Sequence, residues 1–191
     1  MSSATPKLPK HWSDFLDAVD RALSRPVELH CLGGFVLEVA HGHARVTGDL
    51  DYIEIIPSDA MAELQRIAGP DSALAKKHRL YFQHVGVASY PESYAARLTE
   101  FHPSHFRNLR LFEFEAHDLA LSKLARNSPV DREDVAYLAK VVPLDSAVLQ
   151  TRYREELRPI IIGDREYHDR TLQMWIESYF GPTEKVGEGS P

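Results

Sequence analysis

The chain has 191 residues, of which 43% are hydrophobic and 26% charged, a composition typical of a globular domain. A single cysteine, Cys31, excludes an internal disulfide framework, and the net charge of −6 gives no general support to nonspecific binding of nucleic acids or membranes. The first residues lack the apolar core of a signal peptide, and no apolar run approaches the roughly 20 residues that span a bilayer. We therefore expect a cytoplasmic protein.

The first part of the chain alternates between helix and strand patterns. Polar stretches at 1–10 and 181–191 are expected to be flexible tails. Apolar spacing, glycines and prolines predict a helix over 11–24 with Ser13 as N-cap, a strand over 27–32, a short helix over 35–42 closed by Gly42, a strand over 49–56 closed by Pro57, a helix over 58–68 and a strand over 79–87.

The second part is predicted to be mostly helical. Residues 89–109 are ambiguous and should mix turns with a short helix, and strict alternation over 110–115 predicts a strand. Helices are predicted over 116–127, 131–142, 145–157 and 164–180. The order predicts an α+β fold, with a small mixed sheet flanked by helices in a core at 11–115 and a helical lobe at 116–180.

A paired glycine and a pair of carboxylates suggest a site. Gly33 and Gly34 join a predicted strand to a helix, where backbone N–H groups can approach an anion closely. Asp49 and Asp51 share one face of the next predicted strand, because strand side chains alternate. Two adjacent carboxylates repel each other unless a cation lies between them, and Mg²⁺ prefers carboxylates together with phosphate oxygens. The pattern indicates metal-assisted phosphoryl or nucleotidyl transfer.

Each of these features also has an ordinary structural interpretation. Paired glycines are common in loops, and Asp-x-Asp at the start of a strand is compatible with a solvated turn. Arg45 suits triphosphate recognition, but a salt bridge to Asp49 is the alternative. Thr47 could simply cap the turn before the strand, and Asp131 could be the N-cap of the helix that it begins. From the residues alone, both interpretations stay open.

The glycine turn followed by Asp49-x-Asp51 resembles the signature of the DNA-polymerase-β-like nucleotidyltransferases. With Gly42, Arg45 and Thr47 in between, it is similar to the bacterial branch that contains the AbiEii-type toxins, and to a related nucleotidyltransferase-like family of unknown function. The second half carries further matching elements of that branch, in the same order. They are Asp118-Leu119, Lys123, Asp131 and Asp134.

The resemblance implies roles for the residues that match. Asp49 and Asp51 would hold Mg²⁺ or Mn²⁺, and Gly33 and Gly34 would contact the triphosphate. Nucleotide-binding roles are also implied for residues outside this pair of motifs. They are Arg45, Thr47, Asp118 and Lys123, with Lys123 and Asp118 one turn apart on a single helix.

A third metal-binding carboxylate often completes this type of site. Glu113 and Glu115 on the predicted strand are the nearby candidates, and we take Glu115 as a metal ligand, with capping of the Lys123 helix as its alternative role. Lys123 and Asp134 join the aspartate pair as expected catalytic residues, although the general base stays open between Asp131 and Asp134.

The resemblance also implies an activity. A metal-dependent nucleotidyltransferase would move NMP from an NTP to an acceptor hydroxyl on RNA, protein or a small molecule. As the toxin of a toxin–antitoxin pair, the chain would have an antitoxin protein as its partner. The alternative is a catalytically inactive module of the same fold that binds a nucleotide or a protein. The position of a third carboxylate relative to Asp51 should discriminate between the two.

Overall fold

The computed structural model describes residues 8–102 and 105–180. The predicted C-terminal tail and residues 1–7 of the N-terminal one lie outside these residues. Lys10 already belongs to the first helix, and Leu8 is buried against the core, so the N-terminal tail prediction does not hold for residues 8–10. Within the described residues, no helix has the length and apolar character needed to cross a membrane.

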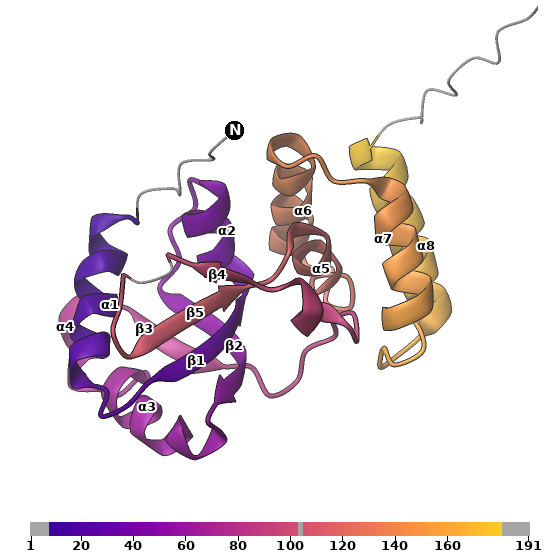
Figure 1. The fold of residues 1–191 in the computed structure, drawn as a ribbon. Helices are drawn as coiled ribbons and strands as arrows, with labels where there is room; N and C mark the ends of the chain where they lie inside the picture. The colour runs from indigo at the N-terminus through magenta and orange to yellow at the C-terminus, as the bar shows by residue number, and fades with distance from the viewer. Residues whose placement is uncertain (1–7, 103–104, 181–191) are drawn as a thin grey trace, which may run out of the picture.

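The fold is α+β, as predicted, with one mixed sheet followed by a set of helices (Figure 1). In the part of the chain that the structure describes, the sheet has five strands in the order β3-β2-β1-β5-β4. β1 is antiparallel to β2 and parallel to β5, β2 is parallel to β3, and β4 is antiparallel to β5. The strands are β1 (Val27–Leu32), β2 (Asp49–Ile56), β3 (Tyr81–His84), β4 (Thr99–Phe101) and β5 (Leu109–Glu113).

The helices surround the sheet and then continue beyond it. Figure 1 shows α5 and α6 between the sheet and the α7–α8 pair. The α-helices are α1 (Lys10–Ala22), α2 (Gly33–His41), α3 (Met61–Ala68), α4 (Ala73–His78), α5 (Ala116–Leu121), α6 (Pro129–Val141), α7 (Ser146–Arg152) and α8 (Arg165–Trp175). Short 3₁₀ or π segments are η1 (Ser58–Ala60), η2 (Tyr94–Arg97), η3 (Tyr153–Leu157) and η4 (Ile176–Phe180).

Several element boundaries differ from the predictions for identifiable reasons. α1 begins before Ser13, with Pro9 at the N-cap position. β3 is shorter than predicted and stops before Gly86. The three-residue strand β4 was hidden in the ambiguous segment, because so short an edge strand has too few residues to show alternation. The C-terminal end of α2 was predicted correctly, since Gly42 adopts the left-handed conformation with φ of 72°.

The predicted helix over 116–127 is divided into two parts. α5 ends at Leu121, and residues 122–126 form turns, so Lys123 lies after the helix rather than on it. The next helix is α6, with Ser128 as its N-cap. The Ser128 hydroxyl accepts from the Asp131 N–H, while the Asp131 carboxylate accepts from the Ser128 N–H. Asp131 is therefore the third residue of a capping box and not the N-cap.

A bulge in β2 decides which side chains face the core. His30 of β1 lies opposite Glu54, whereas Cys31 lies opposite Tyr52, so Ile53 is the extra residue. Both Tyr52 and Ile53 are buried as a result. The four buried side chains of the strand share the core side, and they are Leu50, Tyr52, Ile53 and Ile55. Asp49 and Asp51 are half-buried on the opposite side, which explains how a core strand can begin with two carboxylates.

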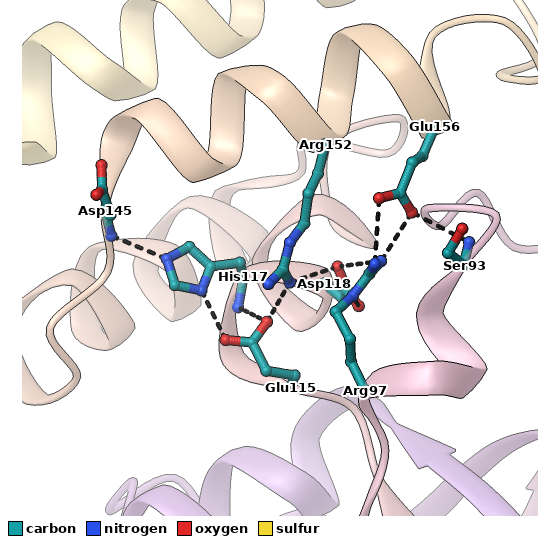
Figure 2. A network of polar contacts seen from close by, with 8 residues as sticks. All are labelled: Ser93, Arg97, Glu115, His117, Asp118, Asp145, Arg152 and Glu156. Atoms are coloured by element: carbon teal, nitrogen blue, oxygen red, sulfur yellow. Dashed lines mark hydrogen bonds and ion pairs between the residues drawn. The ribbon is translucent and has the colours of Figure 1, made fainter.

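An ion-pair network fastens the helical lobe to the loop that follows β3 (Figure 2). The Asp118 carboxylate of α5 is fully buried and accepts from Arg97 Nε at 2.7 Å and from Arg152 Nη1 at 2.9 Å. Arg97 of η2 also pairs with Glu156 of η3 at 2.8 Å, and Arg152 of α7 pairs with Glu115. Three segments that are separate in sequence therefore meet in this network: η2, α5 and the continuous α7–η3 segment.

Replacing Asp118 should destabilise the fold. Asp118→Asn keeps the size of the side chain but leaves Arg97 and Arg152 without their buried counter-charge, so we expect the free energy of unfolding to fall by about 3 kcal/mol in urea denaturation. The control is Asp14→Asn, which removes an exposed pair with Lys10 and should change it by less than about 0.5 kcal/mol. Equal effects of the two substitutions would contradict the importance of the network.

Candidate functional site

The paired glycines pack directly against Thr47 and Asp51, which lie two residues before and two residues after Asp49. Gly33 begins α2 with φ of +76°, and a Cβ atom there would lie 2.4 Å from Asp51 Oδ2. A Cβ atom on Gly34 would lie 3.2 Å from Thr47 Oγ1. Only glycine permits both the positive φ and the close approach at position 33. The glycine turn therefore lies directly against the strand that carries the two aspartates.

The two aspartates form a concentration of negative charge without a paired cation. Within the described residues, neither Asp49 nor Asp51 forms a salt bridge, and Asp49 accepts a hydrogen bond of 2.5 Å from the Thr47 hydroxyl. Burial, together with repulsion from Asp49, raises the pKa of Asp51 to about 6. Burial and the same two carboxylates also raise the pKa of Tyr81, which lies opposite Asp49 on β3. The pair is thus electrostatically suited to receive a cation.

A second cluster places cationic groups beside the aspartates. Asp134 of α6 is almost fully buried and accepts from Lys123 Nζ at 2.8 Å and from Arg45 Nη2 at 2.6 and 2.8 Å. Arg45 therefore pairs with Asp134, and the alternative salt bridge to Asp49 is not formed. The buried Lys123 therefore has an ion-pair partner in Asp134. Three segments separated in sequence meet here, as the order of the motifs predicts.

Glu38 and Arg126 support the site, although sequence reasoning did not identify either of them. The buried Glu38 carboxylate accepts from Thr47 N at 3.1 Å and from Trp12 Nε1 at 3.2 Å, so it anchors the loop before β2 to α1. The signal was a lone carboxylate in the otherwise apolar helix α2. Arg126 pairs with the fully buried Asp131 at 2.6 Å. In the sequence, the only indication for Arg126 was its position between two motifs.

The cluster encloses one cavity and borders another. The first cavity has a volume of about 330 Å³. Nine of the residues described above line it. These lining residues are Gly33, Gly34, Arg45, Thr47, Asp49, Asp51, Lys123, Arg126 and Asp134. The adjacent cavity, of about 430 Å³, shares Gly33, Asp51, Lys123 and Arg126 with the first.

Two predicted site residues lie elsewhere. Asp118 lines neither cavity, and its carboxylate is held by Arg97 and Arg152, so its place is structural. Glu115 has the alternative role, since it caps α5 by accepting from the His117 N–H at 3.0 Å and pairs with Arg152. Burial raises the pKa of Glu115, but the hydrogen bonds from His117 and Arg152 outweigh this effect and bring the pKa to about 2.

The structure also locates the other candidates for a third carboxylate. Glu113 shares its side of β5 with the buried Leu109 and Leu111, which is the core side and not that of Asp51. In the sheet, Asp51 is in register with Gln83 of β3 on one side and with Leu32 of β1 on the other. In residues 8–102 and 105–180, no group of three or more His, Cys, Asp or Glu side chains is arranged to hold a metal ion.

Gly33 should tolerate no side chain. Gly33→Ala places a methyl group against the Asp51 carboxylate and forces a positive φ on alanine, so we expect a loss of about 1–2 kcal/mol in the free energy of unfolding. Gly86→Ala is the matched control, because a Cβ atom there meets nothing within 4 Å. Urea denaturation of both variants measures the difference, and an equal loss in both would refute the close packing at Gly33.

Glu113 should make stability depend on pH. Burial raises the pKa of Glu113 to about 7 from an ordinary 4.5, and its Oε2 atom has no hydrogen-bond partner in the described structure. The folded state then binds an extra proton between these values, so this group lowers stability progressively as pH rises from about 4.5 to about 7. Glu113→Gln should raise the free energy of unfolding by about 1–3 kcal/mol at pH 8 and not at pH 4. A gain of equal size at both pH values would contradict this assignment.

The comparison with protein families agrees with the geometry. A family model described as a nucleotidyltransferase of unknown function (DUF6036) matches residues 16–179, which include both glycines, both aspartates, Lys123 and Asp134. No curated protein and no solved structure matches the chain. The family description supports an enzyme that transfers nucleotidyl groups. Since the match spans most of its length, the chain belongs to the DUF6036 family of nucleotidyltransferases.

Proposed function

We propose that the chain is a Mg²⁺- or Mn²⁺-dependent nucleotidyltransferase that moves NMP from an NTP to an acceptor hydroxyl and releases pyrophosphate. One observation supports this most strongly. The half-buried carboxylates of Asp49 and Asp51 have no ion-pair partner among the described residues, and they line a cavity together with the Gly33–Gly34 turn. A nucleotide complexed with a divalent cation complements such a cavity. Its cation would bind the carboxylates, and its phosphates would accept from the backbone N–H groups.

The donor set fits a divalent cation of this kind. Mg²⁺ is commonly bound in proteins by one or two carboxylates plus substrate phosphates and water, so Asp49 and Asp51 suffice in number. Bound there, the ion would neutralise charge that develops on the transferring phosphoryl group. The raised pKa of Asp51, caused by burial and by Asp49, agrees with a site that favours a bound cation.

The chain's own residues would bind and orient the nucleotide. The first two residues of α2 lie at its N-terminus, where free N–H groups and the helix dipole favour phosphate. Lys123 and Arg45 bring positive charge to the same cavity, and their shared bond to Asp134 fixes their positions. The Thr47 hydroxyl holds Asp49 in place. Positioning and electrostatic stabilisation are the main sources of catalysis in phosphoryl transfer.

A second candidate function is a nucleotide-binding module without catalysis. The observation that favours it is that, among the described residues, no further carboxylate neighbours Asp51 in the sheet, where Gln83 is in register with it, and Glu113 and Glu115 are directed elsewhere. Asp134 does line the cavity, but Lys123 and Arg45 share its carboxylate. Such a module would still bind a nucleotide with its cation and would transfer nothing.

The wider setting rests on the resemblance to the AbiEii-type toxins. We propose a bacterial, cytoplasmic protein, with the toxin of a toxin–antitoxin pair as its role and an antitoxin protein as its partner. The acceptor hydroxyl belongs to RNA, protein or a small molecule in this proposal.

Calorimetric titration tests the nucleotide site. We expect nonhydrolysable NTP analogues to bind the wild type only with Mg²⁺, and Asp49→Asn/Asp51→Asn to weaken this binding at least tenfold, because the variant removes both carboxylates. Asp14→Asn, which removes an exposed carboxylate of α1, is the control and should bind as the wild type does. Absence of binding by the wild type would refute the proposal. Pyrophosphate release with acceptor present separates the enzyme from the silent module.

A further inference from the structure

The cavity next to the proposed nucleotide site has walls of a different character. It has a volume of about 430 Å³, within the range of pockets that hold small molecules. Its walls come from the β1–α2 junction, Asp51 of β2, the residues after β3, the turns after α5, and Ile162 beyond η3. Six of its lining residues are apolar: Leu32, Val85, Val87, Ala88, Ala125 and Ile162.

Asp51 lies where the two cavities meet. Gly33, Asp51, Lys123 and Arg126 line both, whereas Asp49, Gly34, Arg45 and Thr47 line only the first. In phosphoryl transfer the attacking oxygen and the leaving oxygen lie on opposite sides of the phosphorus, roughly in line. If the glycine turn and Arg45 receive the leaving pyrophosphate, the attacking oxygen must approach from the other side of Asp51. The second cavity is on that side.

The rim of the second cavity exposes apolar surface. The side chains of Val87 and Ile162 are 84% and 76% exposed, although both are large and apolar. A further hollow of about 150 Å³ shares Ala88, Ser89 and Ile162 with the cavity and continues its apolar lining through Leu157 and Ile160. Contiguous exposed apolar residues of this kind commonly mark a binding surface.

The cations that line the second cavity each form an ion pair with a buried aspartate. Lys123 pairs with Asp134 and Arg126 with Asp131, and they are the only Lys or Arg residues among those that line the second cavity. Arg158, on the chain segment before Ile162, pairs with Asp169 at 2.8 Å. An RNA acceptor needs several unpaired cations for its backbone phosphates. The walls instead suit an uncharged group.

We propose that the second cavity is the acceptor subsite and that it takes a hydroxyl group carried on an uncharged apolar body, such as a phenol. This inference rests on the proposed nucleotidyl transfer. In the step, the acceptor oxygen forms a bond to the α-phosphorus, the bond from that phosphorus to the bridging oxygen breaks, and pyrophosphate leaves with the electron pair. The proton of the hydroxyl passes to water in the open cavity. The source of the phenol is a tyrosine side chain of a protein or a free small molecule.

Transfer of label from α-³²P-NTPs tests the acceptor class. The probes are N-acetyl-tyrosinamide, an apolar tyrosine-containing heptapeptide and a short RNA with a free 3′-hydroxyl, each with Mg²⁺ and the wild-type chain. We expect label on the tyrosine probes. Label on the peptide alone identifies a protein as the source, and label on both admits a small molecule. Label on RNA alone, or on no uncharged probe while the NTP still binds, would overturn the acceptor assignment and leave the nucleotide site intact.

A variant at the rim locates the acceptor. Ile162→Glu puts a charge on an exposed side chain, so the variant should fold as the wild type does. We expect its KM for the tyrosine probe to rise at least fivefold. Its calorimetric affinity for the Mg²⁺–NTP analogue should be unchanged. Met174→Glu, at an exposed apolar position of α8, is the matched control and should change neither value. If Ile162→Glu weakens NTP binding instead, the cavity holds the nucleoside and the inference fails. If the wild type binds no NTP, the proposed function itself fails.

Discussion

Two carboxylates held side by side on one face of a strand are the constraint on which the rest of this site depends. Asp49 and Asp51 cannot separate, because they lie two residues apart on one face of β2, and both side chains are half-buried there. The fold accepts the repulsion and places Gly33 against Asp51, with no room for a side chain between them. A structure without a functional use for this charge would gain stability by replacing one aspartate, which is the usual conflict between stability and function at an active site.

The helical lobe supplies positive charge through Lys123, which is held in place by Asp134. Lys123 lies in the turns after α5 and Asp134 in the second turn of α6, so the junction of the two helices fixes the distance of the cation from the aspartates. That junction is itself held in place: the capping box of Ser128 and Asp131 starts α6, and Trp175 of α8 donates to Asn127 at 3.2 Å. Behind it, the Asp118 network of Figure 2 fastens α5 to the loop after β3. The helical lobe thus fixes the positions of Lys123 and Asp134.

Much of this arrangement could be predicted from local sequence patterns. The bounds of β1 and β2 and the glycine that ends α2 follow from alternation and backbone conformation, which are properties of short segments. Side-chain partners could not be predicted in the same way. Arg45 is closer in sequence to Asp49 than to Asp134, yet it pairs with Asp134, because α6 packs against α2. Asp118 resembles a substrate-binding residue in sequence, but two arginines from other elements neutralise it.

The absence of a third carboxylate beside Asp51 in the described part of the sheet also could not be predicted from sequence. Glu115 was predicted to be a metal ligand and Glu113 was the other candidate, but the strand order places β1 between β5 and β2, so neither of them neighbours Asp51. The bulge at Ile53 had a similar effect, since it changes which side chains face the core within a single strand. Sheet order and bulges depend on contacts between distant segments. They decide here that the sheet neighbours of Asp51 are Gln83 and Leu32 and not a glutamate.

The most direct test of the central claim, that Asp49 and Asp51 together form a cation site, is an EPR titration of Mn²⁺ in the presence of a nonhydrolysable NTP analogue. The sharp signal of free Mn²⁺ is lost on binding to the nucleotide as well as to the protein, so each titration is compared with one at the same nucleotide concentration without protein. The account predicts binding at one site per chain in the wild type and at least tenfold weaker binding in Asp49→Asn/Asp51→Asn. Equal Mn²⁺ affinity in the two proteins would contradict it.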